Sequence, residues 1–97
     1  MALRVIWTTG AVKERREILK FYNERNGNSK YSLELASHFR TSMCLVSNQE
    51  LMGRPTNRNG IRCLFVLDYS FLFTVTTEHI AVLSIWDNRR DPEKRPF

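Results

Sequence analysis

The chain has 97 residues, enough for one domain with a hydrophobic core, and its 42% apolar and 26% charged residues exclude wholesale disorder. No run approaches the roughly 18 apolar residues of a membrane span, the opening does not resemble a signal peptide, and two cysteines provide neither a disulfide framework nor a metal clip. A reduced, cytoplasmic protein without metal or cofactor is therefore expected. Its net charge of +5 favours an anionic partner, the alternative being a basic domain without one.

The opening residues alternate in polarity, which predicts a short first strand with the apolar members Leu3, Val5 and Trp7. A helix should follow from Ala11 to about Arg25, with a hydroxyl of Thr8-Thr9 as its N-cap. Its apolar residues recur at helical spacing, and they are Ala11, Val12, Ile18, Leu19 and Tyr22. Its charged residues lie on the opposite side and form a solvated face.

A second helix is expected to run to about Ser47. Gly27 can adopt the left-handed conformation that ends the first helix, and Ser29 or Ser32 can cap the second. The apolar stripe of this second helix consists of Leu33, Ala36, Phe39, Met43 and Val46, and the nearby His38 is expected to be partly buried. Because the connection is short and each helix has one apolar face, the two should form an antiparallel hairpin packed on a sheet.

Residues 60–94 contain three apolar runs rich in β-branched and aromatic side chains, which predicts a three-stranded meander. Hairpin turns are expected at Asp68–Ser70 and Thr77–His79, while Glu50–Asn59 is expected to be a loop. The tail after Asp87 should be irregular, with a single turn. The fold class is therefore α+β: a four-stranded, mainly antiparallel sheet in the order β-α-α-β-β-β, with the helical hairpin on one face and the first strand beside the meander.

This order, together with V-I-W-T at Val5–Thr8, G-I-R at Gly60–Arg62 and R-R-D-P-E-K at Arg89–Lys94, resembles the RelE/ParE toxin superfamily over essentially the whole chain. The resemblance implies one toxin domain over residues 1–97, the toxin of a type II toxin–antitoxin (plasmid stabilisation) module. Its partner would be an acidic cognate antitoxin encoded by an adjacent gene, with which it can form an oligomer.

The G-I-R and R-R-D-P segments look more like the ParE branch, whose members inhibit growth by binding DNA gyrase. The first alternative is a RelE-like, ribosome-dependent endoribonuclease that cuts messenger RNA. The second alternative is a non-toxic basic adaptor that binds nucleic acid. Whether the chain is an enzyme is left open, because no convincing acid–base constellation stands out.

Arginines at the borders of the apolar sheet are the candidate site residues, because guanidinium groups bind phosphates or carboxylates in bidentate fashion. They are Arg54, Arg58, Arg62, Arg89 and Arg90. If the chain is a ribonuclease, Arg62, Arg89 and Arg90 would bind the phosphate, and His79 or Glu78 would transfer protons. Strand pairing would have to bring Arg62 near Arg89.

Other side chains near Arg89 and Arg90 are expected to interact with these arginines or with the chain around them. Asp87 and Asp91 should pair with these arginines or with the tail backbone. Trp86 is expected in the core as the last strand residue, the alternative being that it stacks on an arginine or a base. The sheet face opposite the helices should keep some apolar surface. That surface is either a partner site or is shielded by the Glu50–Asn59 loop and the tail.

Overall fold

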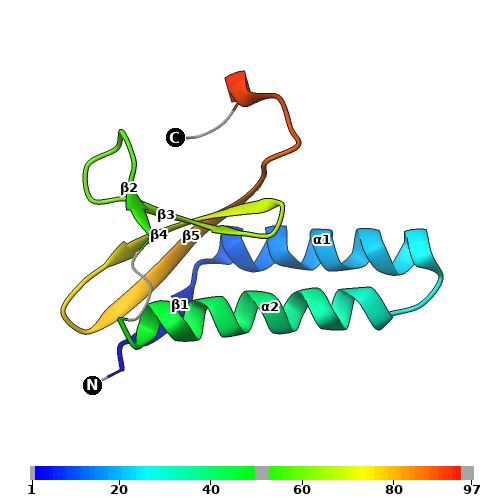
Figure 1. Ribbon diagram of the computed structural model, residues 1–97, viewed down its shortest axis with the longest axis horizontal. Coiled ribbons are helices and arrows are strands. Elements are labelled where there is room, and N and C mark those ends of the chain that lie inside the picture. Colours follow the sequence, from blue (N-terminus) through cyan, green and yellow to red (C-terminus); the bar gives the residue numbers. More distant parts are fainter. Residues whose placement is uncertain (1, 50–52, 95–97) are drawn as a thin grey trace.

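The computed structural model describes residues 2–49 and 53–94, and Figure 1 shows two helices packed against one face of a twisted sheet. The elements in chain order are β1 (Arg4–Trp7), α1 (Thr9–Asn26), α2 (Lys30–Ser47), β2 (Arg54–Pro55), β3 (Arg62–Val66), β4 (Tyr69–Val75), β5 (His79–Asp87) and a 3₁₀ turn at Pro92–Lys94. The expected α+β class, the helical hairpin and the single turn in the tail are confirmed.

The expectation of four antiparallel strands is wrong in two respects. The sheet has five strands in the order β1-β5-β4-β3-β2, and β1 runs parallel to β5. The polarity pattern of β1 indicates which side chains face the core, but it carries no information on strand direction once two helices intervene. The added strand, β2, has only two residues and includes Pro55, which an edge strand tolerates. It lies in the expected loop, of which residues 50–52 are outside the described part.

The ends of α1 follow from local chemistry. The Thr8 hydroxyl accepts a hydrogen bond from the Ala11 amide at 3.2 Å, and Gly27 closes the helix with φ of +70°. The start of α2 differs from the expectation, because neither serine side chain caps it. Asn28 Oδ1 accepts from the Lys30 amide at 3.0 Å instead, while Ser32 lies inside the helix and its hydroxyl bonds to the Asn23 side chain.

The core lies between the helical hairpin and the sheet. Its largest members are Phe71 and Phe73 of β4 and Phe39 of α2, whose ring meets Phe71 edge-on at 4.9 Å between centroids. The other buried members of this core are Ala11, Tyr22, Leu35, Met43, Val46, Val66, Tyr69, Ile80, Val82 and Ile85. These side chains come from both helices and from β3, β4 and β5.

The buried side of α2 is rotated relative to the expected stripe. Leu35 is buried and Leu33 is 66% exposed, and His38 and Cys44 are also exposed, so the expected partial burial of His38 is wrong. The apolar band of this helix is wider than one face. Packing against α1 and the sheet selects the side that contains Leu35, and the sequence pattern does not distinguish the two choices.

The first hairpin turn is shorter than expected, and the second is shifted by one residue. They are formed by Leu67–Asp68 and by residues 76–78, so Tyr69 and Ser70 belong to β4 and His79 begins β5. On the sheet face opposite the helices, Cys63 and Leu72 are buried, whereas Phe65 is 52% exposed. This face is therefore partly shielded and partly open. Within the described ranges, neither helix is long and apolar enough to span a membrane.

Candidate functional site

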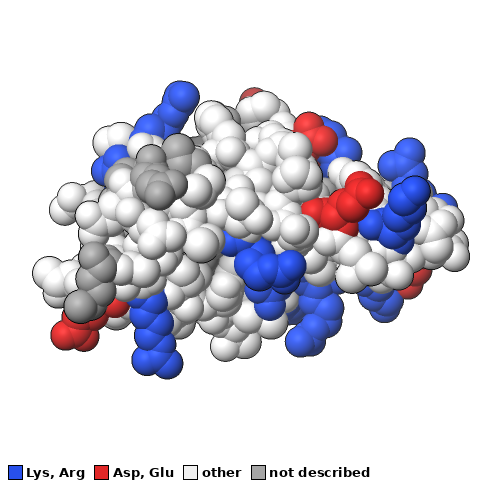
Figure 2. Space-filling model, turned by 60° about the horizontal axis from the view of Figure 1, so that its bottom comes forward, with Lys and Arg blue, Asp and Glu red and all other residues white. Residues whose placement is uncertain are grey.

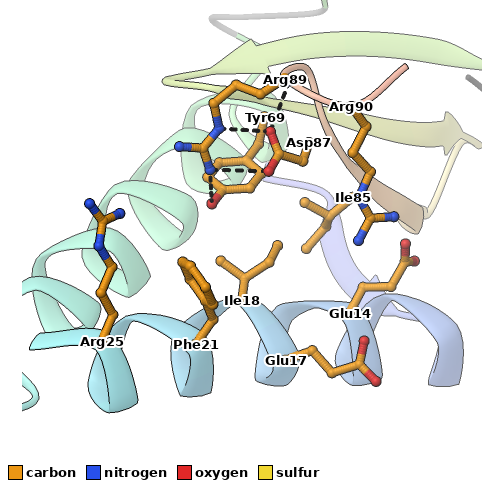
Figure 3. A pocket seen from close by; sticks show the side chains of 10 residues that line it. All are labelled: Glu14, Glu17, Ile18, Phe21, Arg25, Tyr69, Ile85, Asp87, Arg89 and Arg90. Carbon is orange, nitrogen blue, oxygen red and sulfur yellow. Dashed lines mark hydrogen bonds and ion pairs between the residues drawn. The ribbon is translucent and has the colours of Figure 1, made fainter. Parts of the chain in front are cut away.

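The end of β5 carries a hydrogen-bonded network centred on Arg89 (Figure 3). The Arg89 guanidinium donates to both carboxylate oxygens of Asp87, from Nε to Oδ1 and from Nη2 to Oδ2, each at 3.0 Å. Nη2 also donates to the hydroxyl of Tyr22 on α1 at 3.0 Å and to that of Tyr69 on β4 at 3.4 Å. Register places Tyr69 directly opposite Asp87. The network thus connects the tail, the sheet and the first helix.

Electrostatic interactions and burial in this network shift the pKa values of Asp87, Arg89 and Tyr69. The hydrogen bond from Arg89 is the main cause that holds the pKa of Asp87 below its ordinary value, and the same bond raises the pKa of Arg89. Burial, followed by the hydrogen bond to Tyr22, raises the pKa of Tyr69 well above its ordinary value. Tyr69 therefore stays protonated near neutrality, where it donates and accepts hydrogen bonds and does not act as a base.

The lowered pKa of Asp87 makes a testable contribution to stability. An aspartate has an ordinary pKa of about 4 in the unfolded chain. Since the folded value is lower, the stabilisation is fully present above about pH 4 and is lost as the pH falls through the folded pKa. We expect Asp87→Asn to destabilise the protein at pH 7, and the difference from wild type to shrink below pH 4. Chemical unfolding at both pH values measures this, and a difference independent of pH would contradict it.

A groove of about 450 Å³ lies between α1 and the end of β5, beside this network. Ile18 and Phe21 of α1 and Ile85 of β5 give it an apolar centre. Its charged lining has both signs, with Glu14 and Glu17 at one side in Figure 3 and Arg25 and Arg90 among the cations. The groove can therefore hold an apolar side chain of a partner between groups that bind either charge.

Two further arginines lie over aromatic rings of the sheet. The Arg54 guanidinium lies 5.2 Å from the centroid of Phe65, and that of Arg90 lies 5.5 Å from the centroid of Trp86. Phe65 and Trp86 flank Ser70 across three neighbouring strands, so the two stacked pairs share one row. Trp86 is half-buried and lies outside the core cluster, so its expected place in the core is wrong and the alternative, stacking on an arginine, is what the structure shows.

The remaining predicted residues are dispersed. Arg58 is exposed in the loop between β2 and β3, and Arg62 Nη2 donates to the Gly53 carbonyl at 3.0 Å. Arg62 lies opposite Phe73, which lies opposite Val82 in the middle of β5, so strand pairing does not bring Arg62 to the Arg89 end.

The proposed proton-transfer residues are at the opposite end of the sheet from Arg89 and Arg90. His79 is the first residue of β5, and its Nδ1 forms a hydrogen bond with Thr76 Oγ1 at 3.3 Å. Glu78 is exposed in the adjoining turn. His79 and Asp87 are the two ends of the 9-residue strand β5, which corresponds to about 26 Å at about 3.3 Å per residue. The set suggested for a ribonuclease is therefore not assembled in one place.

Sequence reasoning identified Arg89, Arg90 and Asp87 but missed Tyr22 and Tyr69, which it placed in the core and in a turn. The pairing of Asp87 with Arg89 was expected and is confirmed, as is the tail-backbone role of Asp91, whose carboxylate accepts from the Glu93 amide at 3.0 Å. Tyr22 could have been found from the sequence, because its hydroxyl is a polar group on the otherwise apolar face of the first helix and needs a hydrogen-bond partner. Among the residues described, no cluster of three His, Cys, Asp or Glu side chains offers a metal site.

The chain matches no protein-family model and no curated protein. Among solved structures it is similar to a chain of the structure described as "Chromosomal ParDE TA system from P. aeruginosa", with a TM-score of 0.75 and 21% sequence identity. The match covers 89% of this chain and 96% of that chain. The chain therefore has the fold of a component of a ParDE toxin–antitoxin system, in agreement with the ParE-like resemblance of its sequence.

Proposed function

We propose that the chain is the toxin of a type II toxin–antitoxin pair, of the ParE type, and that it inhibits growth by binding its target. The observation that carries this proposal is the match in fold over 89% of this chain and 96% of the ParDE system chain. The net charge of +5 supports it, because a basic toxin and an acidic antitoxin attract each other.

Action by binding is favoured over RNA cleavage by the placement of the charged groups. Arg89 is held by Asp87 and Tyr22, and Tyr69 has a raised pKa, so this network is a fixed ion pair that suits contact with a partner. The groups proposed for proton transfer in the ribonuclease alternative lie about 26 Å away along β5. The ParE-like segments make DNA gyrase the target that we propose.

The toxin proposal is tested by inducing the chain in bacteria, alone and together with the small acidic protein encoded beside its gene. We expect growth to stop within a few generations when the chain is induced alone and to continue when both proteins are present. Normal growth of cells that accumulate the folded chain would overturn the proposal. Circular dichroism of the purified protein verifies that the induced chain is folded.

The stacked arginines provide a prediction about the target surface. Arg54 and Arg90 are exposed cations fixed on aromatic rings, so replacing either by alanine removes a binding group and leaves the core intact. We expect Arg54→Ala and Arg90→Ala to weaken growth inhibition while changing the free energy of unfolding by about 0.5–1 kcal/mol at most. Colony counts over a range of inducer concentrations measure the effect.

The matched control is Lys20→Ala, which removes an exposed cation of a surface ion pair with Glu24 on α1. Its toxicity and stability should both remain close to wild type, because exposed pairs contribute little. If the two arginine variants are as toxic as this control, the stacked arginines do not contact the target.

A further inference from the structure

One side of α1 presents a stripe of charged and apolar residues to the groove beside Arg89. The order along this α1 stripe is acidic, apolar and basic, as Figure 3 shows, and its members are Glu14, Glu17, Ile18, Phe21 and Arg25. On a helix with about 3.6 residues per turn these positions fall within an arc of about 100°. Glu14 and Ile18 are half-buried, and the other three are exposed. The α1 stripe is therefore open to a partner.

The α1 stripe is complementary to itself. Positions 14 and 25 are symmetric about the point midway between positions 19 and 20, and so are positions 18 and 21. When a second α1 packs antiparallel on the first at that point, a two-fold axis passes through it and every contact occurs twice. Each Glu14 then faces Arg25 of the other copy, and each Ile18 faces Phe21 of the other copy. A stripe with the same charge at both ends would instead repel its own copy.

Phe21 supplies the apolar surface for such a contact. Its side chain is 53% exposed, and its ring meets that of Tyr22 edge-on at 5.1 Å between centroids. The Tyr22 hydroxyl accepts the hydrogen bond from Arg89, so the Phe21 ring lies beside a fixed network. Burial of Phe21 against Ile18 provides the favourable free energy, because exposed ion pairs contribute little and mainly set the register.

The charges around the groove favour a second copy as its occupant. The whole chain has a net charge of +5, but the groove is lined by three carboxylates and three guanidinium groups, including the Asp87–Arg89 pair. Two copies that meet here bring no excess of positive charge together. Figure 2 shows Lys and Arg side chains at the centre of the face turned forward, with acidic side chains to either side. A contact between two copies at the centre of that face would bring like charges together.

We infer that the α1 stripe is a surface for self-association, on which a second copy of the chain packs its own α1 stripe in antiparallel orientation about a two-fold axis. The carboxylates of Glu14 and Glu17 bind the Arg25 guanidinium of the other copy. The stripe is about 17 Å long, at the small end of specific interfaces, so the dimer is weak and forms as the concentration rises. This inference concerns assembly and does not depend on the proposed toxin function.

Exchanging the charges at the two ends of the α1 stripe tests this pairing. Sedimentation equilibrium of the full chain from about 5 to 500 µM measures the dissociation constant of the dimer. Arg25→Glu places a carboxylate opposite Glu14 twice in each dimer, so we expect the dissociation constant to rise about tenfold or more. Glu14→Arg should have the same effect through paired arginines. The double variant Glu14→Arg/Arg25→Glu restores opposite charges and should return the dissociation constant to within about threefold of wild type.

Arg16→Glu is the matched control for Arg25→Glu. Arg16 is also an exposed arginine of α1, but helical geometry places it on the side away from the α1 stripe. Both variants change the net charge equally, so only the position of the charge differs. The dissociation constant of Arg16→Glu should stay within about threefold of wild type. Glu14 also accepts a hydrogen bond from the Ser84 hydroxyl at 3.3 Å, so circular dichroism and thermal unfolding verify that every variant is folded.

Three results would overturn the inference. The wild-type chain could remain monomeric over the whole concentration range, Arg25→Glu could leave the dimer intact, or the folded double variant could fail to restore it. A monomeric chain whose growth inhibition is weakened by Phe21→Ala would assign the α1 stripe to a different protein instead. All the sedimentation results are independent of growth arrest, so they leave the toxin proposal to its own test.

Discussion

Replacing Phe71 by alanine should lower the free energy of unfolding by about 3–5 kcal/mol, a large part of the roughly 5–15 kcal/mol available to a small domain. Phe71 is fully buried at the centre of β4, and its ring meets those of Phe39 of α2 and Trp7 of β1 edge-on. Truncation therefore leaves a cavity where β1, the sheet and the helical hairpin meet. Urea denaturation followed by tryptophan fluorescence measures the loss.

Phe65→Ala is the matched control for Phe71→Ala, because it removes the same side chain from the neighbouring strand. Phe65 is 52% exposed and lies under Arg54, so its truncation should cost about 1 kcal/mol or less. Equal losses for the two variants would contradict the placement of the core between the helices and the sheet.

Gly53→Ala is expected to be the most damaging substitution of a glycine, with a loss of more than about 2 kcal/mol. Gly53 has φ of +64°, and a Cβ at this position would lie 2.4 Å from the Cys63 carbonyl oxygen of β3. The alanine therefore adds a left-handed backbone cost to a clash with a strand that must shift. The shift would also disturb the hydrogen bond from Arg62 to the Gly53 carbonyl. Thermal and urea unfolding measure the loss.

Gly27→Ala separates these two causes. Gly27 has a similar φ of +70°, but a Cβ there would meet nothing within 4 Å. Only the conformational cost of about 1 kcal/mol should apply. If Gly53→Ala is no worse than Gly27→Ala, the close approach of Gly53 to β3 is not present in solution.

Local chemistry in the sequence predicted the parts of the fold that depend on neighbouring residues. The Thr8 cap and the Gly27 closing residue fix α1 from within a few positions of its ends. The direction of β1, by contrast, is set by pairing with residues more than seventy positions away, such as Val5 with Ile80. The pairing of β2 through Arg54 and Pro55 is too short to produce a polarity pattern.

The candidate site also combines contacts between neighbours in the sequence, which could be predicted, with contacts between distant residues, which could not. Asp87 and Arg89 are two residues apart, so their ion pair was foreseeable from the sequence. The bond from Arg89 to Tyr22 spans 67 positions and depends on how α1 crosses the end of β5. An approach of Arg62 to Arg89 depended on strand register, and the register of Arg62 opposite Phe73 was not available from composition or spacing.

The measurement that tests the central claim most directly is pulse-labelling of DNA and protein synthesis in the minutes after the wild-type chain is induced in bacteria. A ParE-type toxin that binds gyrase predicts that thymidine incorporation falls first, while methionine incorporation continues. A fall of protein synthesis first would contradict this account and favour cleavage of messenger RNA. Unchanged incorporation of both labels, in cells that contain the folded chain, would contradict the toxin function itself.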